Sequence, residues 1–241
     1  MNHTTGPQGL CFARGADSRA IAFIQPEQFP DWLARQPGLT RNWLESQRFA
    51  GKAGQFILLP DETGQWQRVL AVLAGNDPYA VAHLPKLLPM GDYHRCPDSA
   101  AMLHPDTLLL GWGLGAYRFE HYLDKAAIPR LHSEGHSAQV LAMLDASLRI
   151  RDWINLPTED MGPEQLQAAV FDTALAFNAK AEAIIGDDLL AQGFPTIHAV
   201  GRASHRAPRL LRLDWGDAAH PHVVLCGKGV CFDTGGLDIK A

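Results

Sequence analysis

The stretch His222–Ala241 reads HVVLCGKGVCFDTGGLDIKA. Its apolar start, Val223–Leu225, predicts a buried strand, and the glycines that follow let the backbone turn sharply around Lys228. Asp233 then supplies a hard anionic oxygen, and Lys240 adds a second amine. We therefore expect a strand that runs into a glycine-rich turn carrying two lysines and an aspartate.

Spacing alone leaves the role of this turn open. A phosphate-binding P-loop needs Ser or Thr after its lysine, whereas Gly229 follows Lys228. The glycines of Gly111–Gly115 lack the spacing of a dinucleotide-binding fingerprint and are typical of close helix packing. By spacing, the charges of the terminal stretch also fit an ordinary surface turn, and only glycine clusters favour a nucleotide-binding domain.

Strands alternate with helices along the rest of the chain, which predicts an α/β architecture. We expect strands at Ala20–Ile24, Gln55–Leu59, Arg68–Ala74, Ala181–Ile185, Arg209–Trp215 and His222–Cys226, and a loop or short strand at Ile197–Val200. We expect helices at Trp32–Phe49, Tyr79–Leu88, Leu108–Tyr122, Ser137–Trp153, Pro163–Asn178 and Asp187–Gln192. The polar stretch Leu123–Gly135 predicts a linker, so we expect an N-terminal α/β domain at residues 1–135 and a second domain at 136–241.

Charge and composition restrict the function classes. A formal net charge of -5 over 241 residues argues against a nucleic-acid-binding protein. The basic stretch Gly201–Arg212 has no interleaved aromatic residues, which favours a solvated loop and strand edge. No apolar run approaches the roughly 20 residues that span a bilayer, so we expect no membrane partner.

The cysteines and the N-terminus indicate the compartment. Cys11, Cys96, Cys226 and Cys231 are scattered, which predicts free thiols in a reducing compartment and no disulfide framework. The start MNHTTGPQGL lacks the cationic residues and apolar core of a signal peptide. We therefore expect a cytoplasmic protein.

The terminal stretch resembles the signature of the leucyl aminopeptidase family, the M17 metallopeptidases, which reads close to V-G-K-G-x-x-F-D-[ST]-G-G-x-x-I-K-P. The positions that match, without a gap, are Gly227, Lys228, Gly229, Phe232, Asp233, Thr234, Gly235, Gly236, Ile239 and Lys240. Three upstream stretches also resemble the family: Tyr117–Tyr122 (Y-R-F-x-x-Y), Asn155–Leu166 (N-x-P-x-x-x-M-x-P-x-x-L) and Gly193–Leu213.

The resemblance implies a metal-dependent aminopeptidase, a hydrolase that releases leucine-type N-terminal residues from peptides with a free N-terminus. Lys228 matches a metal-ligating lysine, and Asp233 matches an aspartate that bridges two divalent metal ions, Mn²⁺ or Zn²⁺. Lys240 matches a catalytic lysine that stabilises the oxyanion formed when metal-activated water attacks. A lysine amine binds a metal only when neutral, and desolvation beside a cation favours that form.

The resemblance also implies an N-terminal α/β domain, a catalytic α/β domain and a hexameric homo-oligomer. The family pattern continues past Ala241 with further carboxylate ligands, and it has proline where Ala241 stands. One aspartate and one lysine cannot hold two divalent ions, so we expect this chain alone to be inactive, as the N-terminal domain plus an incomplete metallopeptidase domain. The alternative is a non-catalytic family member that acts as a binding or assembly module.

Overall fold

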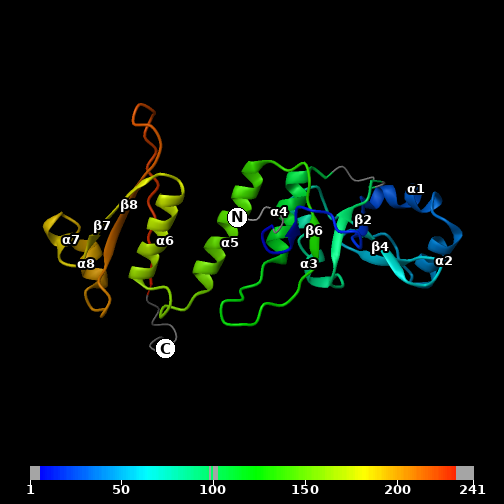
Figure 1. Cartoon of the computed structure of the whole chain (residues 1–241), viewed down its shortest axis with the longest axis horizontal. Coiled ribbons are helices and arrows are strands. Elements are labelled where there is room, and N and C mark those ends of the chain that lie inside the picture. The colour runs from blue at the N-terminus through cyan, green and yellow to red at the C-terminus, as the bar shows by residue number, and fades with distance from the viewer. Residues whose placement is uncertain (1–5, 98, 100–102, 232–241) are drawn as a thin grey trace. The chain divides into compact units, whose positions relative to one another are not determined.

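The structure is a computed structural model that describes residues 6–97, 99 and 103–231. Contacts divide the chain into two compact units, Met1–Asp152 and Trp153–Ala241 (Figure 1). Helix α5 (Ala138–Asn155) runs across this division. The domain boundary expected at residue 135 stays a prediction.

A six-stranded, mostly parallel sheet forms the centre of the first unit, in the order β1-β6-β5-β2-β4-β3. Its strands are β1 (Leu10–Cys11), β2 (Arg19–Ile24), β3 (Phe56–Pro60), β4 (Trp66–Val72), β5 (Asp92–Arg95) and β6 (Arg130–His132). Only β3 runs antiparallel to its neighbour, because it forms a hairpin with β4 around Asp61 and Gly64. The expected α/β class and the hairpin are confirmed.

Helices cover both faces of this sheet. They are η1 (Pro26–Gln28), α1 (Phe29–Ala34), α2 (Gly38–Ser46), η2 (Pro78–Ala80), α3 (Leu84–Leu87) and α4 (Pro105–Ala116). Successive strand side chains point to opposite faces. In β2, Ile21 and Phe23 therefore join the core formed with α3 and α4, whereas Ala22 and Ile24 join the core formed with α1 and α2.

The glycines of α4 let neighbouring chain segments approach closely. A Cβ atom on Gly111 would lie 2.0 Å from the Pro78 carbonyl oxygen, and one on Gly115 would lie 1.9 Å from that of Ala82. A Cβ atom on Gly113 would lie 2.4 Å from the side chain of Leu144. These glycines sit within a helix and not in a phosphate-binding turn, so the helix-packing interpretation is confirmed.

Prolines and tertiary contacts shorten several expected helices. The helix expected at Trp32–Phe49 is two helices separated at Pro37, because proline disfavours helical backbone at the residue before it. The expected helix Tyr79–Leu88 is reduced to η2 and α3. Helix α4 ends before Tyr117, whose hydroxyl lies 2.9 Å from an Asp152 carboxylate oxygen and whose ring faces the Arg151 guanidinium at 3.8 Å.

The segment expected to be a linker is part of the first unit's sheet. Residues Arg130–His132 form β6, which lies between β1 and β5, and Leu131 is fully buried. The linker prediction for Leu123–Gly135 is therefore wrong for these residues. Its polarity misled the prediction because only Leu131 of this short strand enters the core.

The described residues that follow α5 form a two-stranded antiparallel sheet and three helices. Its elements are α6 (Pro163–Ala176), β7 (Lys180–Ile185), α7 (Asp188–Ala191), α8 (Pro195–Gly201) and β8 (Arg209–Asp214). Helix α6 begins at Pro163 as expected, since proline suits the first helical position. The loop or strand expected at Ile197–Val200 is wrong: these residues belong to α8, which Pro195 also starts.

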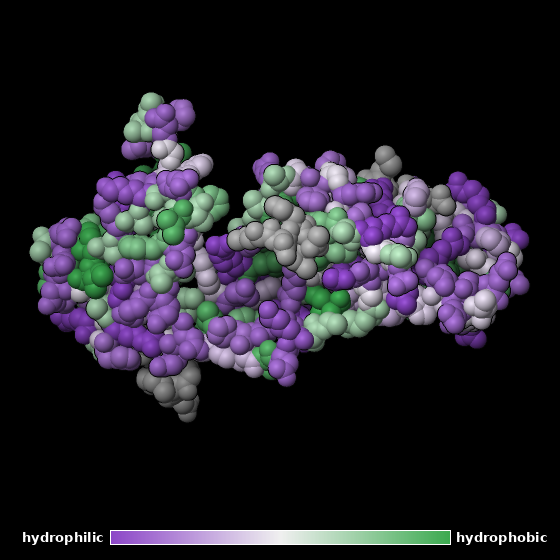
Figure 2. Space-filling view, viewed as in Figure 1, coloured by the Kyte–Doolittle hydropathy of each residue, from purple (hydrophilic) through white to green (hydrophobic). Residues whose placement is uncertain are grey.

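Apolar side chains remain exposed on the second unit, as the green surface in Figure 2 illustrates. Leu175, Val200 and Trp215 are 73–80% exposed. No helix in the described part of the chain is long and apolar enough to cross a membrane. All four cysteines are free thiols, as expected.

Candidate functional site

The stretch with the predicted site residues follows β8 and has no regular secondary structure from Pro221 to Cys231. The expected strand His222–Cys226 is therefore wrong for this structure. A strand needs hydrogen-bonding neighbours, and no described strand pairs with this stretch. Its apolar residues Val223, Val224 and Leu225 are consequently 83%, 78% and 91% exposed.

Of the predicted site residues, the structure describes Lys228 alone. Lys228 is exposed and lies between two glycines in this extended stretch. Asp233 and Lys240 lie outside the described residues. Whether the three lie together is therefore not tested by the described residues, and their assignment stays a prediction.

The chain just beyond Lys228 rests on the first turns of α6. A Cβ atom on Gly229 would be 3.4 Å from the Leu166 side chain, which is ordinary van der Waals contact. Cys231 is partly buried; this burial and the nearby Glu164 carboxylate raise the pKa of its thiol, while Arg206 and Arg209 oppose the increase. Helix α6 thus lies beside Gly229 and Cys231, the described residues that follow Lys228.

Arg209, at the start of β8, connects that strand to α6. Its side chain is 9% exposed, and its guanidinium donates one hydrogen bond to Gln167 at 2.6 Å and pairs with the Glu164 carboxylate. Charge-assisted hydrogen bonds of this kind are stronger than neutral ones. Arg209 therefore fixes α6 against β8, near Cys231.

Arg206 holds the loop that precedes α6. Its guanidinium donates hydrogen bonds to the carbonyl oxygens of Thr158 at 2.7 Å and Glu159 at 3.0 Å. A Cβ atom on Gly162 would lie 2.1 Å from this guanidinium, so a larger residue there would displace the Arg206 side chain. The loop that resembles the family's N-x-P-x-x-x-M-x-P-x-x-L stretch is thereby tied to the Gly201–Arg212 stretch.

Sequence reasoning missed these two structural roles. It read the arginines of Gly201–Arg212 as solvated charges, because spacing does not reveal that a side chain will be buried. Arg212 does fit that reading, since its exposed side chain pairs with Asp214. Pro208 precedes Arg209 at the start of a predicted strand. This proline was the sequence signal for the role of Arg209, since it fixes where the arginine enters the sheet.

The described residues do not by themselves form a metal centre. Among residues 6–97, 99 and 103–231, no group of three or more His, Cys, Asp or Glu side chains could hold a metal ion. Lys228 offers one nitrogen ligand, whereas a divalent ion takes at least four donors. A two-metal site thus requires residues other than those the structure describes.

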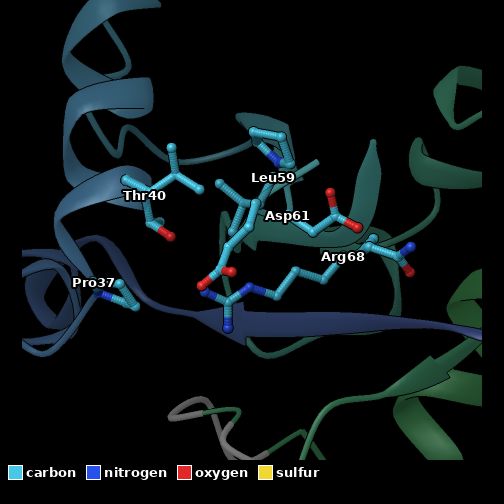
Figure 3. Close-up of a pocket in the computed structure, with 9 residues that line it drawn as sticks. Pro37, Thr40, Leu59, Asp61 and Arg68 are labelled. Atoms are coloured by element: carbon cyan, nitrogen blue, oxygen red, sulfur yellow. The ribbon is translucent and has the colours of Figure 1, made fainter. Parts of the chain in front are cut away.

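A separate hollow of about 270 Å³ lies in the first unit, between the start of α2 and the β3–β4 hairpin (Figure 3). Pro37, Thr40, Leu59 and Arg68 line it together with Asp61. The Asp61 carboxylate accepts hydrogen bonds from Thr63 and Gln65, which lower its pKa and tie it into the hairpin turn. Lys228, the predicted site residue that the structure describes, does not line this hollow.

Two parts of one family's sequence pattern match the chain. Residues 20–132 match the family described as "M17 aminopeptidase, N-terminal domain", and residues 149–241 match "Cytosol aminopeptidase family, catalytic domain". The chain belongs to the M17 aminopeptidase family. It carries the N-terminal domain and part of the catalytic domain of this family of metalloaminopeptidases.

This M17 chain is similar to longer relatives over the part that they share. The "Cytosol Aminopeptidase from Coxiella burnetii" has a TM-score of 0.84 and 39% identity, over 95% of this chain and 51% of that chain. A "Probable cytosol aminopeptidase" of Corynebacterium efficiens is 36% identical over 144 residues, which are 54% of this chain and 29% of the relative. The chain spans about half the length of the solved relative.

A more distant structure shares the fold alone. The "Bottromycin maturation enzyme BotP in complex with Mn" has a TM-score of 0.63 and 17% identity, over 85% of this chain and 46% of that chain. At this identity the likeness carries no residue roles over to the M17 chain.

Proposed function

We propose that this chain serves in a two-metal aminopeptidase that releases leucine-type N-terminal residues from peptides with a free N-terminus. The observation that carries the proposal is the gapless match of Gly227–Lys240 to the family signature, inside a region that matches the catalytic domain. A gapless match preserves the spacing between charged groups, on which a metal site depends.

In this proposal each charged residue of the signature has one role. Lys228 and Asp233 bind metal, and Lys240 is the catalytic residue, whose protonated amine donates a hydrogen bond to the oxyanion that develops on the substrate carbonyl. Two bound metal ions would supply an activated water and hold the substrate amine. Because the described residues lack a complete donor set, we assign no geometry to the metals.

Metal identity, assembly and location belong to the same proposal. We propose Mn²⁺ or Zn²⁺ as the ions, a hexameric homo-oligomer as the assembly and the cytoplasm as the compartment. The name of BotP in complex with Mn supports the choice of metal ion. The names of the cytosol aminopeptidase relatives support the cytoplasmic location. Size-exclusion chromatography with light scattering tests the assembly.

The DNA that follows codon 241 gives the first test. If the reading frame continues into further Asp and Glu codons in the family's D-x-E-x-R arrangement, a complete two-metal enzyme is encoded. If the frame stops at codon 241, an active two-metal enzyme is contradicted, because one lysine and one aspartate cannot hold two ions.

Hydrolysis of leucine p-nitroanilide gives the second test. We expect the protein translated from the complete reading frame to cleave it when Mn²⁺ or Zn²⁺ is added, and to lose activity in a chelator. Absence of cleavage in a stably folded protein, with either metal, contradicts the enzyme and supports the alternative of a non-catalytic binding or assembly module.

A further inference from the structure

The hollow between the start of α2 and the β3–β4 hairpin has the size of a small-molecule site (Figure 3). Its volume of about 270 Å³ lies just below the roughly 300–1,000 Å³ of pockets that hold drug-sized ligands. A ligand no larger than a single amino acid therefore suits it. Neither the family match nor the names of the relatives gives its lining residues a role.

Apolar residues make up much of the lining. Thr40 and Leu59, the most deeply buried residues of the lining, are 5% and 1% exposed. Further apolar surface comes from Pro37, Leu39 and Pro60. Ligand pockets combine such a lining with a few polar groups that orient the ligand. The hollow can therefore hold an aliphatic side chain.

The Thr40 hydroxyl is a polar group that the protein leaves open to this hollow. It forms no hydrogen bond with another residue in the described part of the chain, although Thr40 is only 5% exposed. Figure 3 shows Thr40 on the α2 side of the hollow, with its hydroxyl directed into it. Most polar side chains that are this deeply buried have a partner. A ligand in the hollow can be the partner of this hydroxyl.

Arg68, on β4, supplies the cationic group of the lining. Its side chain runs along the hollow toward Pro37 in Figure 3. The guanidinium Nη2 donates a hydrogen bond to Gln36 Oε1 at 2.7 Å, and this neutral partner orients the group. Arg68 forms no ion pair with any described residue. Its other N–H groups can therefore bind a carboxylate of a ligand.

Two carboxylates in the lining disfavour a simple anion as the ligand. Asp61 is tied into the hairpin turn, where its Oδ1 accepts hydrogen bonds from the amides of Thr63 at 2.8 Å and Gln65 at 3.1 Å. Glu62 is exposed and forms no ion pair or hydrogen bond with another described residue. Two negative charges thus face the single positive charge of Arg68. A ligand that binds Arg68 through a carboxylate needs an ammonium group as well.

We propose that this hollow binds a free aliphatic amino acid of about the size of leucine. The carboxylate of the amino acid accepts hydrogen bonds from Arg68 and Thr40, and its ammonium group pairs with Glu62. Its aliphatic side chain packs against Leu39 and Leu59. Such an amino acid is also a product of the proposed aminopeptidase; this link rests on the proposed function, whereas the binding does not.

NMR titration of the isotope-labelled 241-residue chain with leucine tests the proposal. We expect saturable shifts of the amide signals of Thr40, Glu62 and Arg68. Two analogues, 4-methylpentanoate without the ammonium group and 3-methylbutylamine without the carboxylate, should bind at least about fivefold more weakly, because each loses one charged contact. Absence of saturable leucine binding, or equal binding of either analogue, overturns the proposal. The titration needs no metal and no catalysis, so a negative result leaves the proposed function intact.

Variants of the two charged partners locate the binding. We expect Arg68→Gln to weaken leucine binding about tenfold and the exposed Glu62→Gln about threefold. Arg149→Gln and Glu27→Gln, at exposed residues of the same unit outside the hollow, are the matched controls and should bind leucine as the parent does.

Unchanged binding in either partner variant, or equal weakening by its control, overturns the assignment. Far-ultraviolet circular dichroism checks that each variant folds. Because the Glu62 side chain has no partner among the described residues, Glu62→Gln keeps the test decisive even if Arg68→Gln, which also loses its bond to Gln36, fails to fold.

Discussion

The two units of the chain bury their apolar residues to very different extents. In the first unit, both faces of the six-stranded sheet are covered, and Phe23, Leu109 and Trp112 are completely buried. Among the described residues of the second unit, the only buried hydrophobic side chains are Ala174 and Leu189. The first unit therefore has a closed core of its own, whereas the second presents apolar surface that a further chain segment or another subunit could cover.

This difference explains where packing determines stability. Close-packed interiors respond to the loss or gain of a single methylene, whereas exposed apolar side chains do not. Substitutions in the first unit should therefore be costly, and those on the apolar surface of the second should be nearly neutral in the chain by itself. Matched substitutions in the two units test this difference in packing.

The largest effect is expected from Gly115→Ala in α4. The added Cβ atom would lie 1.9 Å from the Ala82 carbonyl oxygen, so a backbone segment must move. We expect the free energy of unfolding to fall by about 3 kcal/mol. Denaturant titration followed by tryptophan fluorescence measures it. Gly38→Ala is the control, since nothing lies within 4 Å of its Cβ position; a similar loss in both variants would refute a specific packing effect.

Removal of a leucine side chain compares the units directly. We expect Leu144→Ala to cost about 3 kcal/mol, because this side chain is fully buried in the first unit's core. We expect Leu175→Ala, in the second unit and 80% exposed, to change the free energy of unfolding by less than about 0.5 kcal/mol. The same denaturant titrations give both values. A large cost at Leu175 would mean that the second unit has a core of its own around this position.

A smaller effect is expected from Arg209→Ala. This substitution leaves Glu164 and Gln167 without their partner on β8, and we expect a cost of about 2 kcal/mol. Arg212→Ala on the same strand is the control, because its exposed pair with Asp214 should contribute less than about 1 kcal/mol. Thermal unfolding monitored by circular dichroism compares them. Equal costs would show that the bonds of Arg209 to α6 contribute no more than a surface pair.

The smallest effect concerns pH and is confined to the first unit. Burial lowers the pKa of His94 and of His83, so the folded protein binds fewer protons than the unfolded chain just below pH 6.5. The free energy of unfolding should therefore fall as pH drops through about 6.5 and level off below the folded pKa values. Denaturant titrations between pH 5 and 8 should show a weaker slope in His94→Gln but not in His121→Gln, at an exposed histidine. An unchanged slope in His94→Gln would contradict a neutral, buried His94.

The sequence predicted those elements of the fold that local patterns determine. Strands β2, β3, β4, β7 and β8, and the starts of α5 and α6, were recognisable from apolar runs, from Pro163 and from Ser137, whose hydroxyl accepts a hydrogen bond from the Val140 amide at 3.2 Å. Strand β6 could not be predicted, because its place in the sheet depends on pairing with β1 and β5, which lie far away in the sequence.

The candidate site could be predicted only as a motif. The signature points to Lys228, Asp233 and Lys240, but it does not predict how α6 is held beside the Gly229–Cys231 segment. Helix α6 and the loop before it are held by Arg209 and Arg206, whose partners Gln167 and Thr158 lie 42 and 48 residues earlier in the chain. Such distant pairs leave no local pattern in the sequence. The sequence alone does not distinguish an arginine that will be buried from one that will be solvated.

The activity of a Lys240→Ala variant shows whether the signature carries the catalytic lysine. In the protein translated from the complete reading frame and loaded with Mn²⁺ or Zn²⁺, loss of one oxyanion-stabilising donor should lower kcat for leucine p-nitroanilide by about 100-fold or more, with metal content unchanged. Lys125→Ala, at an exposed loop lysine, should leave kcat as it is. An active Lys240→Ala variant, with the kcat of the parent protein, would contradict the proposed role of the signature.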